Sequence, residues 1–164
     1  MSFFTDKVVV VTGGTDGIGR ALVTLLMQQG AKVVTCGRNY DKLYQLQTTY
    51  AGKTLLALPA DVSSEADCQK LMQQAVNVYG TIDILINNAA VFGPPFQLTE
   101  DGFETQFQVN HFSNALLTLL LLPKLESSSS LSHKSRVIMI TSTLYKKGII
   151  NENHFKKGYF FTDC

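Results

Sequence analysis

Four consecutive valines, Val8 to Val11, lead directly into a glycine-rich turn near the start of the chain. A short β-branched run of this kind is typical of a parallel strand that is buried on both faces. From Gly17 to Gln29 the apolar residues recur at helical spacing, and Gly30 is a suitable residue to end the helix. The chain therefore begins with a predicted strand, a tight turn and a helix.

The alternation of strand and helix continues along the rest of the sequence. We predict further strands at Ala31 to Cys36, Thr54 to Leu58, Ile82 to Ile86 and Arg136 to Thr141. Helices are predicted at Tyr40 to Tyr50, from Ser63 or Ser64 to Gly80, and from about Thr99 to Leu122. Alternating elements with apolar strands predict an α/β fold, a doubly wound parallel sheet that stops after about five strands.

Length and composition restrict the classes of function. The 164 residues, 45% of them hydrophobic, are enough for a single domain, residues 1–164, with a real core. A net charge of +1 and a charged fraction of 16% provide no basic field for nucleic acid, so a small-molecule substrate is the expected partner.

Cysteine spacing and the apolar segments bear on location. Cys36, Cys68 and Cys164 form no Cys-x-x-Cys pair and are expected to be reduced thiols, and the three histidines lack the spacing of metal ligands, so no metal is expected. Residues 1–7 do not resemble a signal peptide, and the stretch Ala115 to Leu122 is much shorter than the roughly 20 residues of a membrane span. We therefore expect a cytoplasmic protein with no integral membrane segment.

The glycine-rich turn predicts an anion site. It lies between the first strand and the first helix, where backbone N–H groups and the helix dipole converge. We expect glycine at 13 to permit the turn, at 17 to let a pyrophosphate approach, and at 19 to let the helix pack on the sheet. An ordinary turn without a ligand is the alternative. The candidate cofactor-binding residues here are Thr12, Gly13, Thr15, Asp16, Gly17, Ile18 and Gly19.

Arg38 indicates which dinucleotide would bind. Sheets that bind NAD usually carry an acidic residue after the second strand for the ribose 2′-hydroxyl, but this chain has Cys36-Gly37-Arg38 there. A guanidinium can bind a 2′-phosphate, so the sequence favours NADP(H) over NAD(H). Asp16 would weaken that preference slightly through its negative charge, and the alternative for Arg38 is an ordinary surface arginine at a strand end.

Polar residues also follow the third and fourth strands. Asp61-Val62 and Asn87-Asn88-Ala89-Ala90 stand at carboxyl ends of predicted strands, where ligands bind in such sheets. Capping of the strand ends is the structural alternative for Asp61 and Asn88, and both roles can hold together.

Taken together, the motifs resemble one family. Thr-Gly-x-x-x-Gly-Ile-Gly, Asp-Val, Asn-Asn-Ala-Ala and the later Thr141-Ser142 occur in order, each at the end of a predicted strand. This set is similar to that of the short-chain dehydrogenase/reductase family, and the stretches 99–104 and 107–111 resemble its retinol-dehydrogenase-like branch. The resemblance implies a Rossmann-like fold and an NADP(H)-dependent oxidoreductase acting on an alcohol or carbonyl substrate, small and apolar by analogy with the branch.

The resemblance also implies roles for individual residues. Asp61 would contact the adenine, and Val62 beside it is also a candidate cofactor-binding residue. Asn88, Ala89 and Ala90 would lie along the cofactor, and Asp83 would brace its strand. Asn110 matches an asparagine that supports a water relay to a catalytic lysine, and Ser142 matches a serine that hydrogen-bonds the substrate oxygen. Local packing for Asn110 and an ordinary turn for Ser142 are the alternatives. A homodimer through the long helix, residues 99–122, is also implied.

The family's Tyr-x-x-x-Lys motif is absent from this sequence. Tyr145 is followed four positions later by Ile149, and Tyr159 by Asp163. In the family the lysine and the cofactor lower the phenol pKa from its usual value of about 10 for proton exchange. We therefore expect a truncated chain whose residues 143–164 form an irregular tail. The alternative function is a catalytically inactive form that binds only nucleotide or a protein partner.

Overall fold

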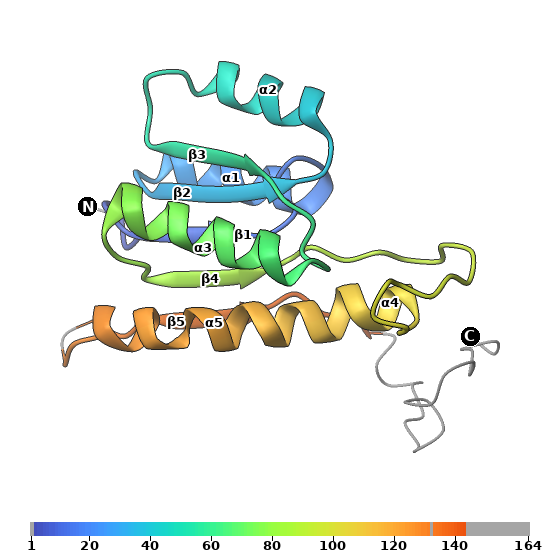
Figure 1. Cartoon of the computed structure of the whole chain (residues 1–164). Helices are drawn as coiled ribbons and strands as arrows, with labels where there is room; N and C mark the ends of the chain where they lie inside the picture. The colour runs from blue at the N-terminus through green and yellow to red at the C-terminus, as the bar shows by residue number, and fades with distance from the viewer. Residues whose placement is uncertain (1, 132, 144–164) are drawn as a thin grey trace.

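The sheet and its helices follow one another in the predicted order. The computed structural model describes residues 2–131 and 133–143 (Figure 1). The strands are β1 (Val8–Val11), β2 (Lys32–Gly37), β3 (Leu55–Pro59), β4 (Ile84–Asn87) and β5 (Arg136–Met139). The helices are α1 (Gly17–Gln28), α2 (Tyr40–Thr49), α3 (Glu65–Tyr79), α4 (Thr105–Phe107), the π-helical segment η1 (Gln108–Phe112) and α5 (Ser113–Ser128).

All five strands are parallel and lie in the order β3-β2-β1-β4-β5. β1 is therefore central. β2 and β3 are added on one side of β1, whereas β4 and β5 are added on its other side, so the strand order reverses between β3 and β4. The prediction of a doubly wound, Rossmann-like parallel sheet is confirmed. In such a sheet, the carboxyl ends of the strands on either side of this reversal form the edge at which ligands bind.

Alternate residues of β1 face two separate cores. Val8 and Val10 pack on one face with residues of α3 and α5, such as Leu71 and Leu117. On the other face, Val9 and Val11 pack with α1 and α2. Both faces of the central strand are thus covered by helices (Figure 1). This double burial explains why the strand is an uninterrupted valine run instead of an alternating one.

The long helix begins later than the predicted Thr99. Residues 99–104 form a turn closed by a bridge between Leu98 and Glu104, and Gly102 has a φ of 78°. The Glu104 carboxylate then caps the helix, accepting hydrogen bonds from the backbone N–H groups of Gln106 and Phe107. The sequence prediction was wrong here because this turn and its acidic cap were not recognised as a helix start.

The same helix also continues beyond the predicted end at Leu122. Pro123 lies inside α5, which runs to Ser128. Leu125 is buried, and the hydroxyl of Ser128 lies 2.7 Å from that of Thr81 and accepts from the backbone N–H of Ile82 at 3.3 Å. These contacts hold the last turn against the segment before β4, so the proline does not end the helix. Among the described residues, no helix is long and apolar enough to cross a membrane.

β5 is shorter than predicted, and all four of its residues are exposed. It ends at Met139, although one further hydrogen bond joins the Ile140 N–H to the carbonyl of Asn87. The predicted tail lies outside the described residues, apart from Thr143.

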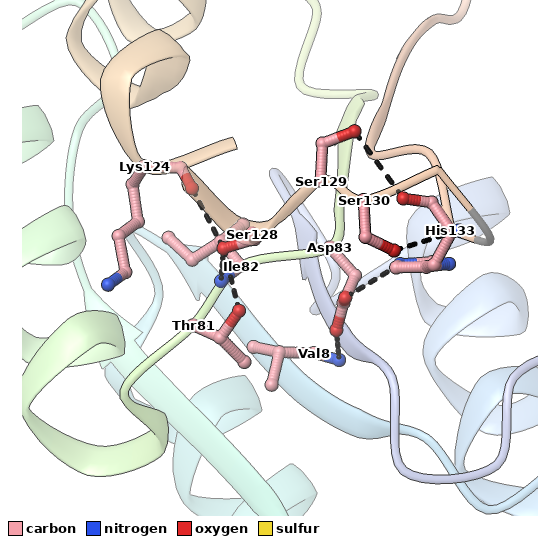
Figure 2. Close-up of polar contacts among 9 residues, drawn as sticks. All are labelled: Val8, Thr81, Ile82, Asp83, Lys124, Ser128, Ser129, Ser130 and His133. Atoms are coloured by element: carbon pink, nitrogen blue, oxygen red, sulfur yellow. Dashed lines mark hydrogen bonds and ion pairs between the residues drawn. The ribbon is translucent and has the colours of Figure 1, made fainter. Parts of the chain in front are cut away.

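A buried carboxylate, Asp83, joins the starts of three strands at the amino-terminal edge of the sheet (Figure 2). Asp83 accepts a hydrogen bond from the backbone N–H of Val8 at 2.8 Å, and its other oxygen lies 2.8 Å from Nε2 of His133. Asp83 precedes β4, Val8 begins β1, and His133 precedes β5. The expected bracing by Asp83 therefore extends to the starts of both neighbouring strands.

We predict that Asp83→Ala lowers the free energy of unfolding by about 1–3 kcal/mol, because the buried Val8 N–H loses its acceptor. His133→Ala should cost less, since Asp83 then still accepts from Val8. Urea unfolding followed by circular dichroism measures both effects. Glu126→Gln, at an exposed acidic residue, is the control. Equal stability of Asp83→Ala and the control would refute the bracing role.

Candidate nucleotide-binding site

A cleft of about 540 Å³ opens at the carboxyl ends of the strands. Twelve of the thirteen predicted cofactor-binding residues line it, from four separate segments of the chain. They are Gly13, Thr15, Asp16, Gly17, Ile18, Gly19, Arg38, Asp61, Val62, Asn88, Ala89 and Ala90. The structure therefore brings together residues from motifs that are separate in the sequence.

Thr12, the remaining predicted residue, is completely buried beneath the cleft. Its hydroxyl oxygen accepts hydrogen bonds from the backbone N–H groups of Asn88 and Ala89, both at 2.9 Å. Asn88 returns the contact, because its side-chain amide donates to the carbonyl of Thr12 at 2.9 Å. The end of β1 is thus joined to the end of β4, and the capping interpretation of Asn88 is correct for the side-chain amide.

Two of the turn's glycines are explained by the backbone, Gly13 by its conformation and Gly19 by a close approach. Gly13 has a φ of 66°, in the left-handed region that favours glycine. A Cβ at Gly19 would lie 2.3 Å from the carbonyl oxygen of Gly13 and 2.5 Å from the amide nitrogen of Asn88. The obstacle at Gly19 is therefore the turn itself, whereas the sequence interpretation had placed it at the sheet.

Gly14 is a site residue that the sequence analysis missed. A Cβ there would lie 2.0 Å from the hydroxyl of Thr35 and 2.7 Å from the Val23 side chain. Thr35 is itself fixed, since its hydroxyl donates to the carbonyl of Val11 at 2.7 Å. The turn therefore packs against β2 as well as β4. The signal for this packing in the sequence was the glycine pair Gly13-Gly14, but the sequence analysis assigned a role only to Gly13.

The mouth of the cleft is formed by the start of α1. A Cβ at Gly17 would meet no protein atom within 4 Å, so this position faces open space. Asp16 caps the helix by accepting from the Gly17 N–H at 2.8 Å, and Ile18 is 66% exposed. An open helix N-terminus with an apolar side chain beside it is a suitable surface for a phosphate with an adjoining flat ring.

Arg38 and Asp61, which follow the neighbouring strands β2 and β3, form an ion pair beside the cleft. Nη1 of Arg38 lies 3.6 Å from Oδ2 of Asp61. The other oxygen of Asp61 accepts from both the backbone N–H and the hydroxyl of Ser63, at 2.9 and 2.7 Å. Asp61 is therefore oriented by its own loop, and it holds the more exposed guanidinium of Arg38 at the edge of the cleft. Asp67, which the sequence analysis missed, accepts from the Asp61 N–H at 2.8 Å.

A buried thiol lies in the wall of the cleft. Burial raises the pKa of Cys36 from 9.0 to about 11, although a hydrogen bond from the backbone N–H of Gly13 partly opposes the shift. Burial likewise raises the pKa of Cys68 to about 12. Both are free cysteines and stay protonated at neutral pH, so Cys36 contributes a small apolar wall to the cleft and no thiolate.

Neither predicted catalytic residue lines the cleft directly. Asn110, in η1, accepts from the backbone N–H of Val91 at 2.8 Å and donates to its carbonyl at 2.9 Å. Val91 does line the cleft, so Asn110 holds its rim in place. Asn114 donates to the Asn110 carbonyl at 2.8 Å. Ser142 is exposed, three residues beyond β5. Tyr145 lies outside the described residues.

The geometry of the cleft is suitable for a dinucleotide. Neighbouring atoms lie too close for any side chain at Gly14 and Gly19, side chains of Thr35 and Val23 in the first case and the Gly13 carbonyl in the second, while Gly17 leaves space open toward the cleft. One arginine, Arg38, lines the cleft directly after β2. Within the part of the chain that the structure describes, no group of three or more His, Cys, Asp or Glu residues could hold a metal ion.

Comparisons with known proteins agree with this arrangement. The sequence model of the family described as short chain dehydrogenase matches residues 7–155. Retinol dehydrogenase 14 of Mus musculus is 38% identical over 95% of this chain and 52% of its own length. Polyprenol dehydrogenase of Homo sapiens is 35% identical over 89% of the chain and 46% of its own length. The chain thus spans about half the length of the curated relatives it matches.

Solved structures of similar fold contain nicotinamide cofactors. A 3-ketoacyl-(acyl-carrier-protein) reductase from Brucella melitensis, complexed with NADH, superposes with a TM-score of 0.72 at 28% identity, over 82% of this chain and 56% of that one. The Pseudomonas aeruginosa RhlG/NADP active-site complex superposes with a TM-score of 0.72 at 31% identity, over 96% and 62%. Both cofactors, with and without the 2′-phosphate, thus occur among similar structures.

We predict that Thr12→Val destabilises the fold by about 2 kcal/mol or more, because two backbone N–H groups at the tip of β4 lose their shared acceptor. Thr12→Ser keeps the hydroxyl and should lose much less. Denaturant unfolding of the two variants provides the measurement. If Thr12→Val, which keeps both branches of the side chain and removes only the hydroxyl, is as stable as wild type, the hydroxyl does not hold the two strand tips together.

Proposed function

Because this chain belongs to the short-chain dehydrogenase/reductase family and its relatives include retinol dehydrogenases, we propose that it is an NADP(H)-dependent oxidoreductase. The proposed substrate is an alcohol or carbonyl compound, small and apolar. The observation that carries the proposal is that the glycine turn, Arg38, Asp61 and Asn88 line one and the same cleft.

The preference for NADP(H) rests on the charges at the end of β2. A carboxylate at this position would bind the ribose 2′-hydroxyl of NAD(H) and repel a 2′-phosphate, but Gly37 and Arg38 stand there instead. The Arg38 side chain is 68% exposed, so its guanidinium is accessible to a phosphate. A planar guanidinium can donate two hydrogen bonds to one phosphate.

We assign the remaining parts of the cofactor to the other segments of the cleft. Backbone N–H groups of 13–19 and the N-terminus of α1 would hold the pyrophosphate. Asp61 and Val62 would border the adenine, and Ala89 and Ala90 would lie along the nicotinamide half. A bound nicotinamide supplies the hydride that is exchanged with the substrate carbon.

Two residues are proposed to act nearer the substrate. Ser142 would donate a hydrogen bond to the substrate oxygen and so stabilise the charge that develops on it. Asn110 would support the proton relay while its side chain holds Val91. That several relatives bear the names of apolar alcohols, retinol and polyprenol, supports an apolar substrate.

A second candidate function is nucleotide binding without turnover. It is favoured by one observation, the absence of Tyr-x-x-x-Lys from the printed sequence. The proton donor and its partner lysine would then be missing, while the segments that line the cleft are present. In this case the chain would bind nucleotide, or a protein partner, without oxidising or reducing a substrate.

We also propose a cytoplasmic location and a homodimer through the long helix. The free, buried thiols of Cys36 and Cys68 are compatible with a reducing compartment. Leu119 and Leu122, exposed at 65% and 40% on α5, are apolar side chains that a second copy could cover.

Titration calorimetry tests the cofactor proposal. Wild-type protein should bind NADPH more tightly than NADH, and Arg38→Gln should weaken NADPH by about tenfold to a hundredfold while leaving NADH nearly unchanged. Lys53→Gln, at an exposed lysine outside the cleft, is the control. Binding of neither nucleotide would refute the proposal.

Incubation with NADPH and a panel of aldehydes and ketones then separates the two candidate functions. Loss of NADPH absorbance that depends on the carbonyl compound supports the oxidoreductase. Tight NADPH binding with no turnover for any compound supports the second candidate.

A further inference from the structure

A buried amide in the π-helical segment η1 joins two loops that are distant in the sequence. The side-chain nitrogen of Gln108 donates to the backbone carbonyl of Ser63 at 3.0 Å and to Oδ2 of Asp101 at 2.6 Å. Its side-chain oxygen accepts from the hydroxyl of Thr99. Gln108 is 5% exposed, so the nitrogen and the oxygen of this buried amide both have protein partners.

The partners of Gln108 require a neutral amide at this position. The Ser63 carbonyl and the Asp101 carboxylate are acceptors, whereas the Thr99 hydroxyl can donate. A glutamate at 108 would place a second carboxylate against the two acceptors, and an apolar side chain would leave both of them without this donor. The amide therefore suits the loop of Ser63 and the turn of residues 99–104 together.

The loop that Gln108 holds through Ser63 is the one that carries Asp61. The N–H and the hydroxyl of Ser63 hold Oδ1 of Asp61, and the Asp61 N–H donates to Asp67. These contacts lie within residues 61–67, so by themselves they do not fix the loop relative to other parts of the cleft. The bond from Gln108 to the Ser63 carbonyl connects the loop to η1.

Asp61 borders two cavities. It lines the nucleotide cleft, and it also lines a second cavity of about 890 Å³ together with Ser63, Thr99, Asp101 and Gln108. A loop beside open space on more than one side has fewer atoms to pack against, and its position then depends more strongly on its hydrogen bonds. The contacts of Gln108 in the wall of the second cavity supply such bonds.

Three successive residues of η1 act on three parts of the cleft. Gln108 holds the Asp61 loop, Val109 is buried and lines the cleft itself, and the Asn110 side chain holds Val91. Residues two apart lie on nearly opposite sides of a helix, so a single turn can hold two segments that lie apart. The position of the Asp61 loop relative to Val91 is therefore set through η1.

We infer that Gln108 is a positioning residue for the adenine half of the cleft: by holding the Ser63 carbonyl, it fixes the loop that presents Asp61 to the nucleotide. The inference rests on the proposed function, because Asp61 and Val62 are assigned to the adenine there. Gln108 does not line the cleft, so it acts through the loop and is assigned no chemical step.

A fragment of the cofactor separates the two sides of η1 in calorimetric titrations. Adenosine 2′,5′-bisphosphate contains the adenine half of NADPH and lacks the nicotinamide. Gln108→Met keeps the length of the side chain and removes its hydrogen bonds. It should raise the Kd for the fragment and for NADPH by the same factor, about threefold to tenfold.

Two further variants complete the titrations. Asn110→Ala should weaken NADPH and leave the fragment unchanged, because Val91 follows the residues assigned to the nicotinamide half. Gln73→Met, at an exposed glutamine on α3, is the matched control. An unchanged Kd for the fragment in Gln108→Met, or equal weakening of the fragment by Gln108→Met and Asn110→Ala, would overturn the inference.

Amide hydrogen exchange without nucleotide tests the positioning independently of binding. Gln108→Met should speed exchange in peptides that contain residues 61–64 and leave residues 91–93 unchanged, and Asn110→Ala should do the reverse. Equally faster exchange in both segments of Gln108→Met would indicate general destabilisation and overturn the inference. Failure of the wild-type protein to bind NADPH or NADH would instead refute the proposed function, and exchange would still decide whether Gln108 fixes the Asp61 loop.

Discussion

The hydroxyl of Thr12 is the contact on which the arrangement of the cleft depends. It is completely buried and accepts the two backbone N–H groups that follow β4, so the tips of β1 and β4 cannot separate. Asn88 completes the connection from the other side by donating to the Thr12 carbonyl. Because the glycine turn begins at the next residue, its position relative to Ala89 and Ala90 follows from this junction. Gly14 and Gly19 then allow the turn to lie directly against β2 and Asn88, with no room for a side chain.

Two edges of the same sheet thus have different tasks. At the amino-terminal edge, Asp83 joins the starts of β1, β4 and β5 with a buried carboxylate, and the side chain of Ser128 fixes the end of α5 nearby (Figure 2). At the carboxyl-terminal edge, polar groups are left at the surface of a cleft where carboxylates and cations are paired, Arg38 with Asp61 and Lys42 with Asp16. The amino-terminal edge is thus held by buried contacts. The paired charges of the carboxyl-terminal edge remain accessible to an anionic ligand that must enter and leave.

Much of this could be predicted from the sequence, because it depends on local patterns. The valine run of β1 and the helical spacing after Gly17 identify their elements, and the motifs at strand ends converge since parallel strands end at one edge. The long helix was misplaced because its start is set by the Glu104 cap after a left-handed Gly102, and its end by contacts of Leu125 and Ser128 that come from elsewhere in the fold. Lys42 and His133 could not be recognised for the same reason, since their partners Asp16 and Asp83 lie 26 and 50 residues away. The roles of Ser142 and Asn110 remain predictions.

Amide hydrogen exchange with and without NADPH, followed by mass spectrometry, tests most directly whether these strand tips form one nucleotide site. The account predicts that NADPH slows exchange together in the glycine turn, at the end of β2, and in the segment after β4. Peptides containing Asp83 and His133, at the other edge of the sheet, should exchange as before. Protection confined to one of the three segments, or centred on the amino-terminal edge, would contradict the account.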